Sequence, residues 1–151
     1  MNLHKIFALT TLILTAALLQ ACSGSEGTDT QANASAPEVF IVSPLDGATV
    51  SSPLTVEFGI RGYTLAPAGT QDEGTGHHHL LIDTPVPALG APIPADDNHR
   101  HFGKAQTFTE LELEPGLHTL QLLLGDGNHV PHSTPLRSEQ ITITVVAEAL
   151  E

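Results

Sequence analysis

The chain of 151 residues is long enough for one ordinary domain and leaves little for a second. It carries 5 Lys and Arg against 17 Asp and Glu, which gives a net charge of −12 at pH 7. Nucleic-acid binding needs clustered cations, so this charge balance predicts no nucleic-acid partner. The chain contains 9 His but only 1 Cys and 1 Met, so unusual side-chain chemistry is concentrated in the imidazoles.

The first 21 residues have the pattern of a secretory signal peptide. Lys5 supplies a positive charge, and the apolar run from Ile6 to Leu19 is too short to span a bilayer comfortably. The following Leu19-Gln20-Ala21-Cys22 resembles the bacterial lipobox, in which the Cys is lipidated and becomes the mature N-terminus. We therefore expect residues 1–21 to be a signal peptide and Cys22 to be the lipidation site.

Residues 22–37 are mostly small and polar, and we expect them to form a lipidated, flexible tether. Ser23 follows the Cys, and a residue other than Asp at this position favours sorting to the outer membrane. The predicted location is therefore the periplasmic face of a bacterial envelope, with the membrane as a partner through the lipid at Cys22. The sequence identifies no protein partner.

Residues 38–147 are predicted to form an all-β domain, an immunoglobulin-like β-sandwich of about seven short antiparallel strands. No helical period is visible, and short β-rich runs alternate with turns rich in Pro, Gly, Asp and Asn. Two long stretches, 62–76 and 84–105, do not fit the strand rhythm and are expected to be loops. The expected strands are 38–43, 54–61, 77–83, 106–113, 118–126 and 139–146.

Six His fall into three doublets along the predicted domain. On a β-strand, residues i and i+2 point to the same side, so a His-x-His pair offers two imidazoles to one point in space. The alternation of strand direction in a sandwich places all three doublets at one end of the domain. We therefore predict that the doublets converge on a Cu(II) or Zn(II) site. The predicted ligands are His77, His79, His99, His101, His129 and His132.

Two further His in the predicted domain are expected to have structural roles. His118 opens a strand at the opposite end of the sandwich, where we expect it to be hydrogen-bonded. His78 has the same strand parity as Leu80 and Ile82, so it is a candidate for the core.

The identity of the metal follows from the types of ligand. The predicted mature chain has no Met, and its single Cys is the expected lipidation site, so soft Cu(I) coordination is disfavoured. Imidazoles suit Cu(II) or Zn(II). Acidic residues near the doublets are open to roles as ligands, as acceptors that orient the imidazoles or as solvated turn residues. These residues are Asp96, Asp97 and Asp126.

Four segments carry a more specific resemblance: GHHHLLID, ADDNHRHFGKAQT, PGLHTLQLLLGD and NHVPH. Together they are similar to the bacterial envelope family known as domain of unknown function 4399, over roughly Gly76 to Val145. The resemblance implies a small exported β domain, and it supplies no established activity.

Three classes of function remain open from the sequence. The leading hypothesis is a non-enzymatic envelope lipoprotein that buffers, delivers or senses Cu(II) or Zn(II). The alternative is a non-catalytic structural or interaction module of the cell envelope, in which the His cluster packs and hydrogen-bonds. A metalloenzyme is the least favoured, because the sequence offers no obvious general base or nucleophile.

Overall fold

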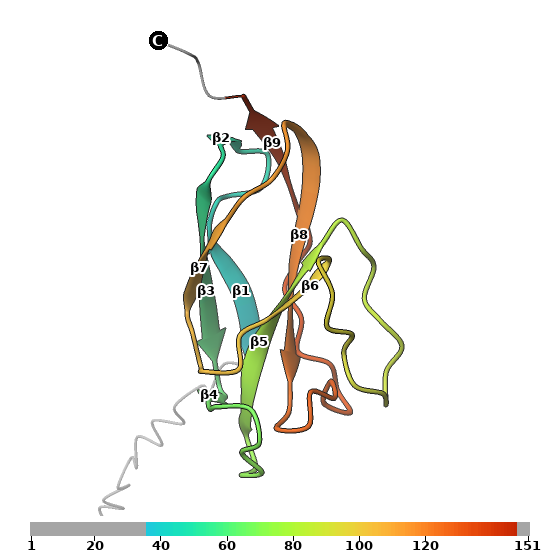
Figure 1. Cartoon of the computed structure of the whole chain (residues 1–151). Coiled ribbons are helices and arrows are strands. Elements are labelled where there is room, and N and C mark those ends of the chain that lie inside the picture. The colour runs from blue at the N-terminus through green and yellow to red at the C-terminus, as the bar shows by residue number, and fades with distance from the viewer. Residues whose placement is uncertain (1–35, 148–151) are drawn as a thin grey trace, which may run out of the picture. The chain divides into compact units, whose positions relative to one another are not determined.

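Alternating apolar and polar residues build two β-sheets that face each other across one core (Figure 1). The computed structural model describes residues 36–147, and no helix is present among them. None of these residues forms a helix that is long and apolar enough to cross a membrane. The predicted signal peptide, Cys22 and almost all of the predicted tether lie outside the described residues.

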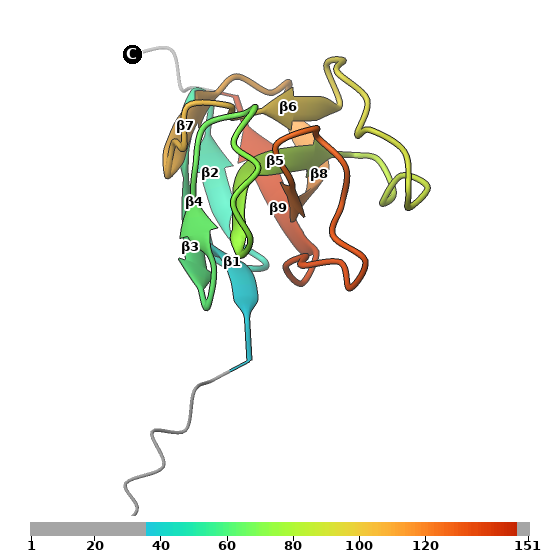
Figure 2. The same cartoon turned by 90° about the horizontal axis from the view of Figure 1, so that it is seen from below.

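The small sheet has the strand order β1-β3-β7, and the large sheet has the order β2-β9-β8-β5-β4, with β6 also paired to β5. Most strand pairs are antiparallel, whereas β2 with β9 and β4 with β5 are parallel. Viewed along the strands, β3 and β7 lie on one side and β5, β8 and β9 on the other (Figure 2). The strands are β1 (Glu38–Ser43), β2 (Thr49–Ser51), β3 (Leu54–Arg61), β4 (Thr64–Leu65), β5 (Thr75–Ile82), β6 (His99–His101), β7 (Phe108–Leu111), β8 (Gly116–Gly125) and β9 (Ile141–Val146).

This architecture confirms the predicted all-β class. All six expected strands are present, and β1 and β3 have the expected bounds. Residues 36–147 contain nine strands, because β2, β4 and β6 add to the six that the sequence predicts. Each of these three strands has only two or three residues, too few to show an alternating pattern, and each forms by pairing with the edge of a longer strand.

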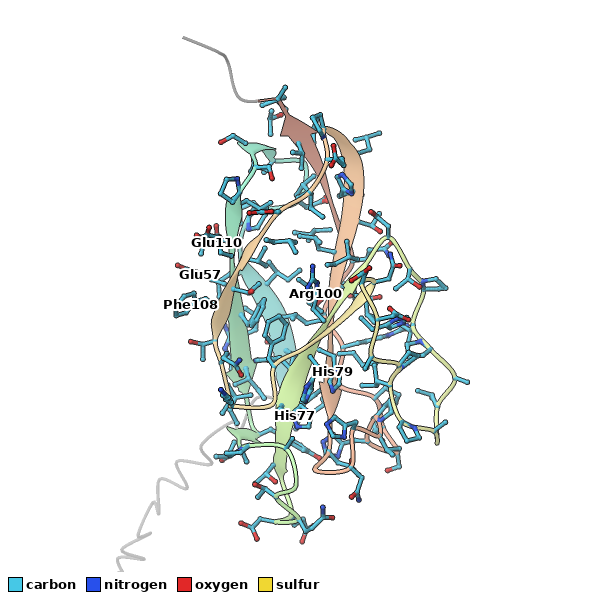
Figure 3. The ribbon with its side chains drawn as sticks, in the orientation of Figure 1. Glu57, His77, His79, Arg100, Phe108 and Glu110 are labelled. Atoms are coloured by element: carbon cyan, nitrogen blue, oxygen red, sulfur yellow. The ribbon has the colours of Figure 1, made fainter. Side chains whose placement is uncertain are left out.

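The core lies between the sheets and follows the period-2 pattern of the strands. On β3, Leu54, Val56 and Phe58 are buried, and the residues between them are exposed. They pack against apolar residues that β5, β8 and β9 supply from the large sheet. On the outer face of the small sheet, Glu57 and Phe108 point away from this core (Figure 3).

Strand β5 departs from this pattern because both of its faces are buried. Its inner face contributes Leu80 and Ile82 to the main core. Its outer face contributes Leu81 to a second, smaller cluster with Ile93 and Leu123. Ile93 belongs to the Pro-rich segment between β5 and β6, so this segment covers the outer face of the large sheet.

His118 lies near the start of β8, at the opposite end of that strand from Gly125, as the sequence predicts. Its Nδ1 donates to the Asp83 carboxylate at 2.6 Å, and its Nε2 donates to the Glu114 carbonyl at 2.8 Å. Burial lowers the pKa of His118, but the two acceptors outweigh burial and the net pKa is raised. The pair thus fixes the end of β5 to the start of β8.

We predict that His118→Gln destabilises the domain more in acid than in alkali. A His whose folded pKa is raised contributes stability that is complete below its unfolded pKa of about 6.5 and is lost as the pH rises through the folded pKa. Urea unfolding of the wild type and the variant at about pH 5.5 and about pH 9 measures the difference. An equal loss of stability at both pH values would show that the His118–Asp83 pair carries no charge-dependent stabilisation.

Candidate metal centre

Four imidazoles from three separate elements meet on the outer face of the large sheet. His77 and His79 come from β5, as Figure 3 shows, His101 from β6, and His129 from the segment that follows β8. All six pairs of rings have centroids between 4.7 and 5.9 Å apart. The cluster lies at the end of the sheet where β5 begins and β8 ends.

The ring nitrogens are close enough to share one metal ion. Nε2 of His77 lies 3.2 Å from Nε2 of His79, and Nε2 of His101 lies 3.1 Å from Nε2 of His129. One ring nitrogen each from His77, His101 and His129 lie within 4.8 Å of one another. Metal–imidazole bonds of about 2.0–2.1 Å hold the nitrogens of a tetrahedral site about 3.3 Å apart, and the two pairs at 3.2 and 3.1 Å match this spacing.

Strand pairing explains why three of the rings meet. His77 and His79 point to the same side of β5 because they are two residues apart. β6 pairs antiparallel with β5, and the register places His101 directly opposite His79. Side chains that are directly opposite each other on adjacent strands stand next to each other on the sheet surface, so His101 joins the pair.

Two glycines leave the space that the rings occupy. Gly125 lies opposite His77 on β8, and a Cβ there would lie 2.9 Å from His79 Nε2. A Cβ at Gly103 would lie 2.6 Å from His101 Nε2. Either side chain would therefore have to displace an imidazole from the cluster.

His129 reaches the cluster through a strained turn. Its φ of 66° lies in the left-handed region, which is uncommon for a residue other than Gly. The Asp126 carboxylate accepts from the backbone N–H groups of Asn128 and Val130 at 2.8 and 2.9 Å, and His129 N donates to the Asp126 carbonyl at 2.9 Å. Asp126 therefore acts as a turn residue that holds His129 in place.

Burial keeps the deeper imidazoles neutral. His77 and His79 are fully buried, with 0 % and 1 % of their surface exposed. Burial, together with the neighbouring imidazoles, lowers the pKa of His77 to about 4 and that of His79 to about 3. Burial also lowers the pKa of His101, with a further contribution from His129. A neutral imidazole is the form that binds a metal, so these residues need not lose a proton first at neutral pH.

The cluster contains four of the six His that the sequence predicts as metal ligands, and His99 and His132 lie outside it. His99 lies on the same face of β6 as His101 but opposite Leu81, and its Nδ1 lies 2.7 Å from Oδ1 of Asp96. His132 packs edge-on against Tyr63, with ring centroids 4.9 Å apart. Strand parity does not extend into the segment after β8, so spacing from His129 could not place His132.

The comparison with protein families confirms the family resemblance that the sequence shows. A family model described as domain of unknown function (DUF4399) matches residues 56–146, which is more than half of the chain, so the chain belongs to this family. All four clustered imidazoles lie inside the matched segment. The description of the family gives no activity.

No curated protein matches the chain. Among solved structures, the X-ray structure of the endo-beta-1,4-mannanase from Thermotoga petrophila is similar, with a TM-score of 0.45 and 12% sequence identity. The match covers 74% of this chain and 20% of that chain, so the chain spans about a fifth of the length of that structure.

His78 lies outside the cluster and in the core, as its parity predicts. It is fully buried, and its ring meets Phe58 edge-on at 5.4 Å. Both of its ring nitrogens are buried without a hydrogen-bond partner among the described residues. Burial lowers its pKa to about 4, with a smaller contribution from His77.

We predict that His78→Leu raises the free energy of unfolding by about 1 kcal/mol or more, because it removes two unpaired buried polar atoms. His78→Gln is the matched control, because it keeps a polar group in the core and gains no stability. Urea denaturation measures both changes. A stability for His78→Leu equal to that of His78→Gln would contradict this account of the core.

Proposed function

We propose that this protein is a non-enzymatic envelope lipoprotein that binds Cu(II) or Zn(II) through its imidazole cluster and serves in metal buffering, delivery or sensing. The observation that carries this proposal is that His77, His101 and His129 each offer a ring nitrogen within 4.8 Å of the others. The net charge of −12 supports it further, because an acidic surface raises the local concentration of cations.

Hydrogen bonding within the cluster satisfies only one nitrogen of each deeply buried ring, since Nε2 of His79 lies 3.2 Å from Nε2 of His77. The Nδ1 atoms of His77 and His79 are buried and have no hydrogen-bond partner among the described residues. Leaving such an atom unpaired costs about 1–3 kcal/mol. Keeping two such residues side by side therefore lowers the stability of the metal-free fold, and a metal bound through the Nε2 atoms would offset this cost.

Added Zn(II) or Cu(II) is expected to raise the melting temperature of the purified, metal-free, untagged protein. A ligand that binds only the folded state at 100 times its dissociation constant adds about 2.7 kcal/mol of stability. The double variant His77→Ala, His129→Ala removes two ligands and should lose this gain entirely. Differential scanning calorimetry with and without metal measures the shift.

His132→Ala is the matched control, because His132 packs against Tyr63 away from the cluster. It should keep the full metal-dependent gain. Wild-type protein that neither gains stability nor retains metal in elemental analysis would refute metal binding and favour the structural module.

The envelope part of the proposal depends on Cys22, and Cys22→Ser tests it. The variant lacks the thiol that would carry the lipid, so it should leave the membrane fraction or accumulate unprocessed. Cell fractionation with immunoblotting and labelling by a radioactive fatty acid measure both outcomes. A variant that still fractionates with membranes in a processed, acylated form would exclude Cys22 as the anchor.

A further inference from the structure

We infer that His79 is the fourth ligand of the cluster, so that a bound metal lies in a closed tetrahedral sphere of four imidazoles. This inference rests on the proposed metal binding and goes beyond the set of three residues that carries it. It assigns the site to the class that holds a metal without leaving a coordination position for a substrate.

The distances between rings favour a tetrahedron over a square plane. In a tetrahedral site with metal–nitrogen bonds of about 2.0–2.1 Å, all six pairs of imidazole centroids lie about 5.2 Å apart. Five of the six observed separations fall between 4.7 and 5.1 Å. A square plane would instead require two pairs of opposite rings to lie about 6.4 Å apart.

The pair of His79 and His129 is the widest, at 5.9 Å, and its opposite pair, His77 and His101, lies at 4.9 Å. One long and one short opposite pair describe a slightly distorted tetrahedron. The set of ring nitrogens that lie within 4.8 Å of one another does not include His79. Closing the sphere therefore requires the rings of His79 and His129 to move toward each other.

The backbone of Gly125 also leaves room for the ring of His79 at this position. A Cβ at Gly125 would lie 2.9 Å from His79 Nε2 and 3.4 Å from the Cα of His129. The absence of a side chain on β8 therefore leaves the space between His79 and the turn that carries His129. At Gly125, therefore, no side chain stands between His79 and His129 to keep the two rings apart.

The chemical consequence concerns both the metal and the role. Zn(II) accepts tetrahedral coordination without a penalty, whereas Cu(II) prefers a tetragonal arrangement. A site with four protein ligands has no position for activated water or substrate, so it holds the metal and does not catalyse a reaction on it. The geometry thus favours Zn(II) over Cu(II) and a non-catalytic role.

Cobalt(II) is a suitable probe, because it replaces Zn(II) and absorbs visible light according to its coordination. The full-length protein loaded with one equivalent of Co(II) should show the strong absorption of a four-coordinate ion. Azide should leave that spectrum unchanged, because no position is open. X-ray absorption of the Zn(II)-loaded protein should count four imidazole nitrogens and needs no variant.

His79→Ala should open the sphere. Its Co(II) spectrum should change when azide is added, and free imidazole should restore the wild-type bands. His99→Ala is the matched control, because His99 is also buried but pairs with Asp96, and its spectrum should remain insensitive to azide.

The outcomes separate the two proposals. Wild-type protein that binds Co(II) but responds to azide, or shows three imidazoles by X-ray absorption, would overturn the closed sphere and leave metal binding intact. Wild-type protein that takes up neither Co(II) nor Zn(II) would overturn the proposed function and this inference with it.

Discussion

The burial of β5 on both of its faces is the constraint on which the rest of the structure depends. In a simple sandwich only the inner face of each sheet is dry. Here the Pro-rich segment 83–98 lies over the outer face, and Ile93 N donates to the carbonyl of His129 at 2.8 Å, which joins this segment to the turn after β8. The imidazoles of His77 and His79 are therefore removed from water although they project away from the main core.

The cluster is held by elements of different rigidity. Three of its rings project from paired strands, whose register fixes them relative to one another. His129 comes from a turn, and the Asp126 carboxylate holds that turn by accepting two backbone N–H groups. Sites on paired strands are more precisely positioned than sites on loops. The arrangement thus combines a rigid base with one imidazole on a connecting segment, and His101 and His129 are the more accessible members of the cluster.

Sequence patterns located the strands and the parity of their residues, because period-2 alternation follows directly from β geometry. The positions of His77, His78 and His79 relative to the core could be predicted for this reason. The sequence could not predict that His101 joins the cluster and His99 does not. Strand β6 has only three residues, and its register against β5 depends on tertiary contacts. The sequence also could not predict that Gly125 leaves space for His79. An isolated Gly in a strand pattern indicates that another group approaches the backbone closely, but it does not identify that group.

The four-ring convergence carries more functional weight than the burial of any single imidazole. His78 is as deeply buried as His77 and has two unpaired nitrogens, yet its ring meets Phe58. Unpaired burial therefore occurs in this strand without a ligand-like environment. His77 differs because three other imidazoles surround it, with centroids at 4.9 to 5.0 Å. Apolar side chains would fill the same space at a lower cost in stability, so the choice of four imidazoles is best explained by what their nitrogens can bind together.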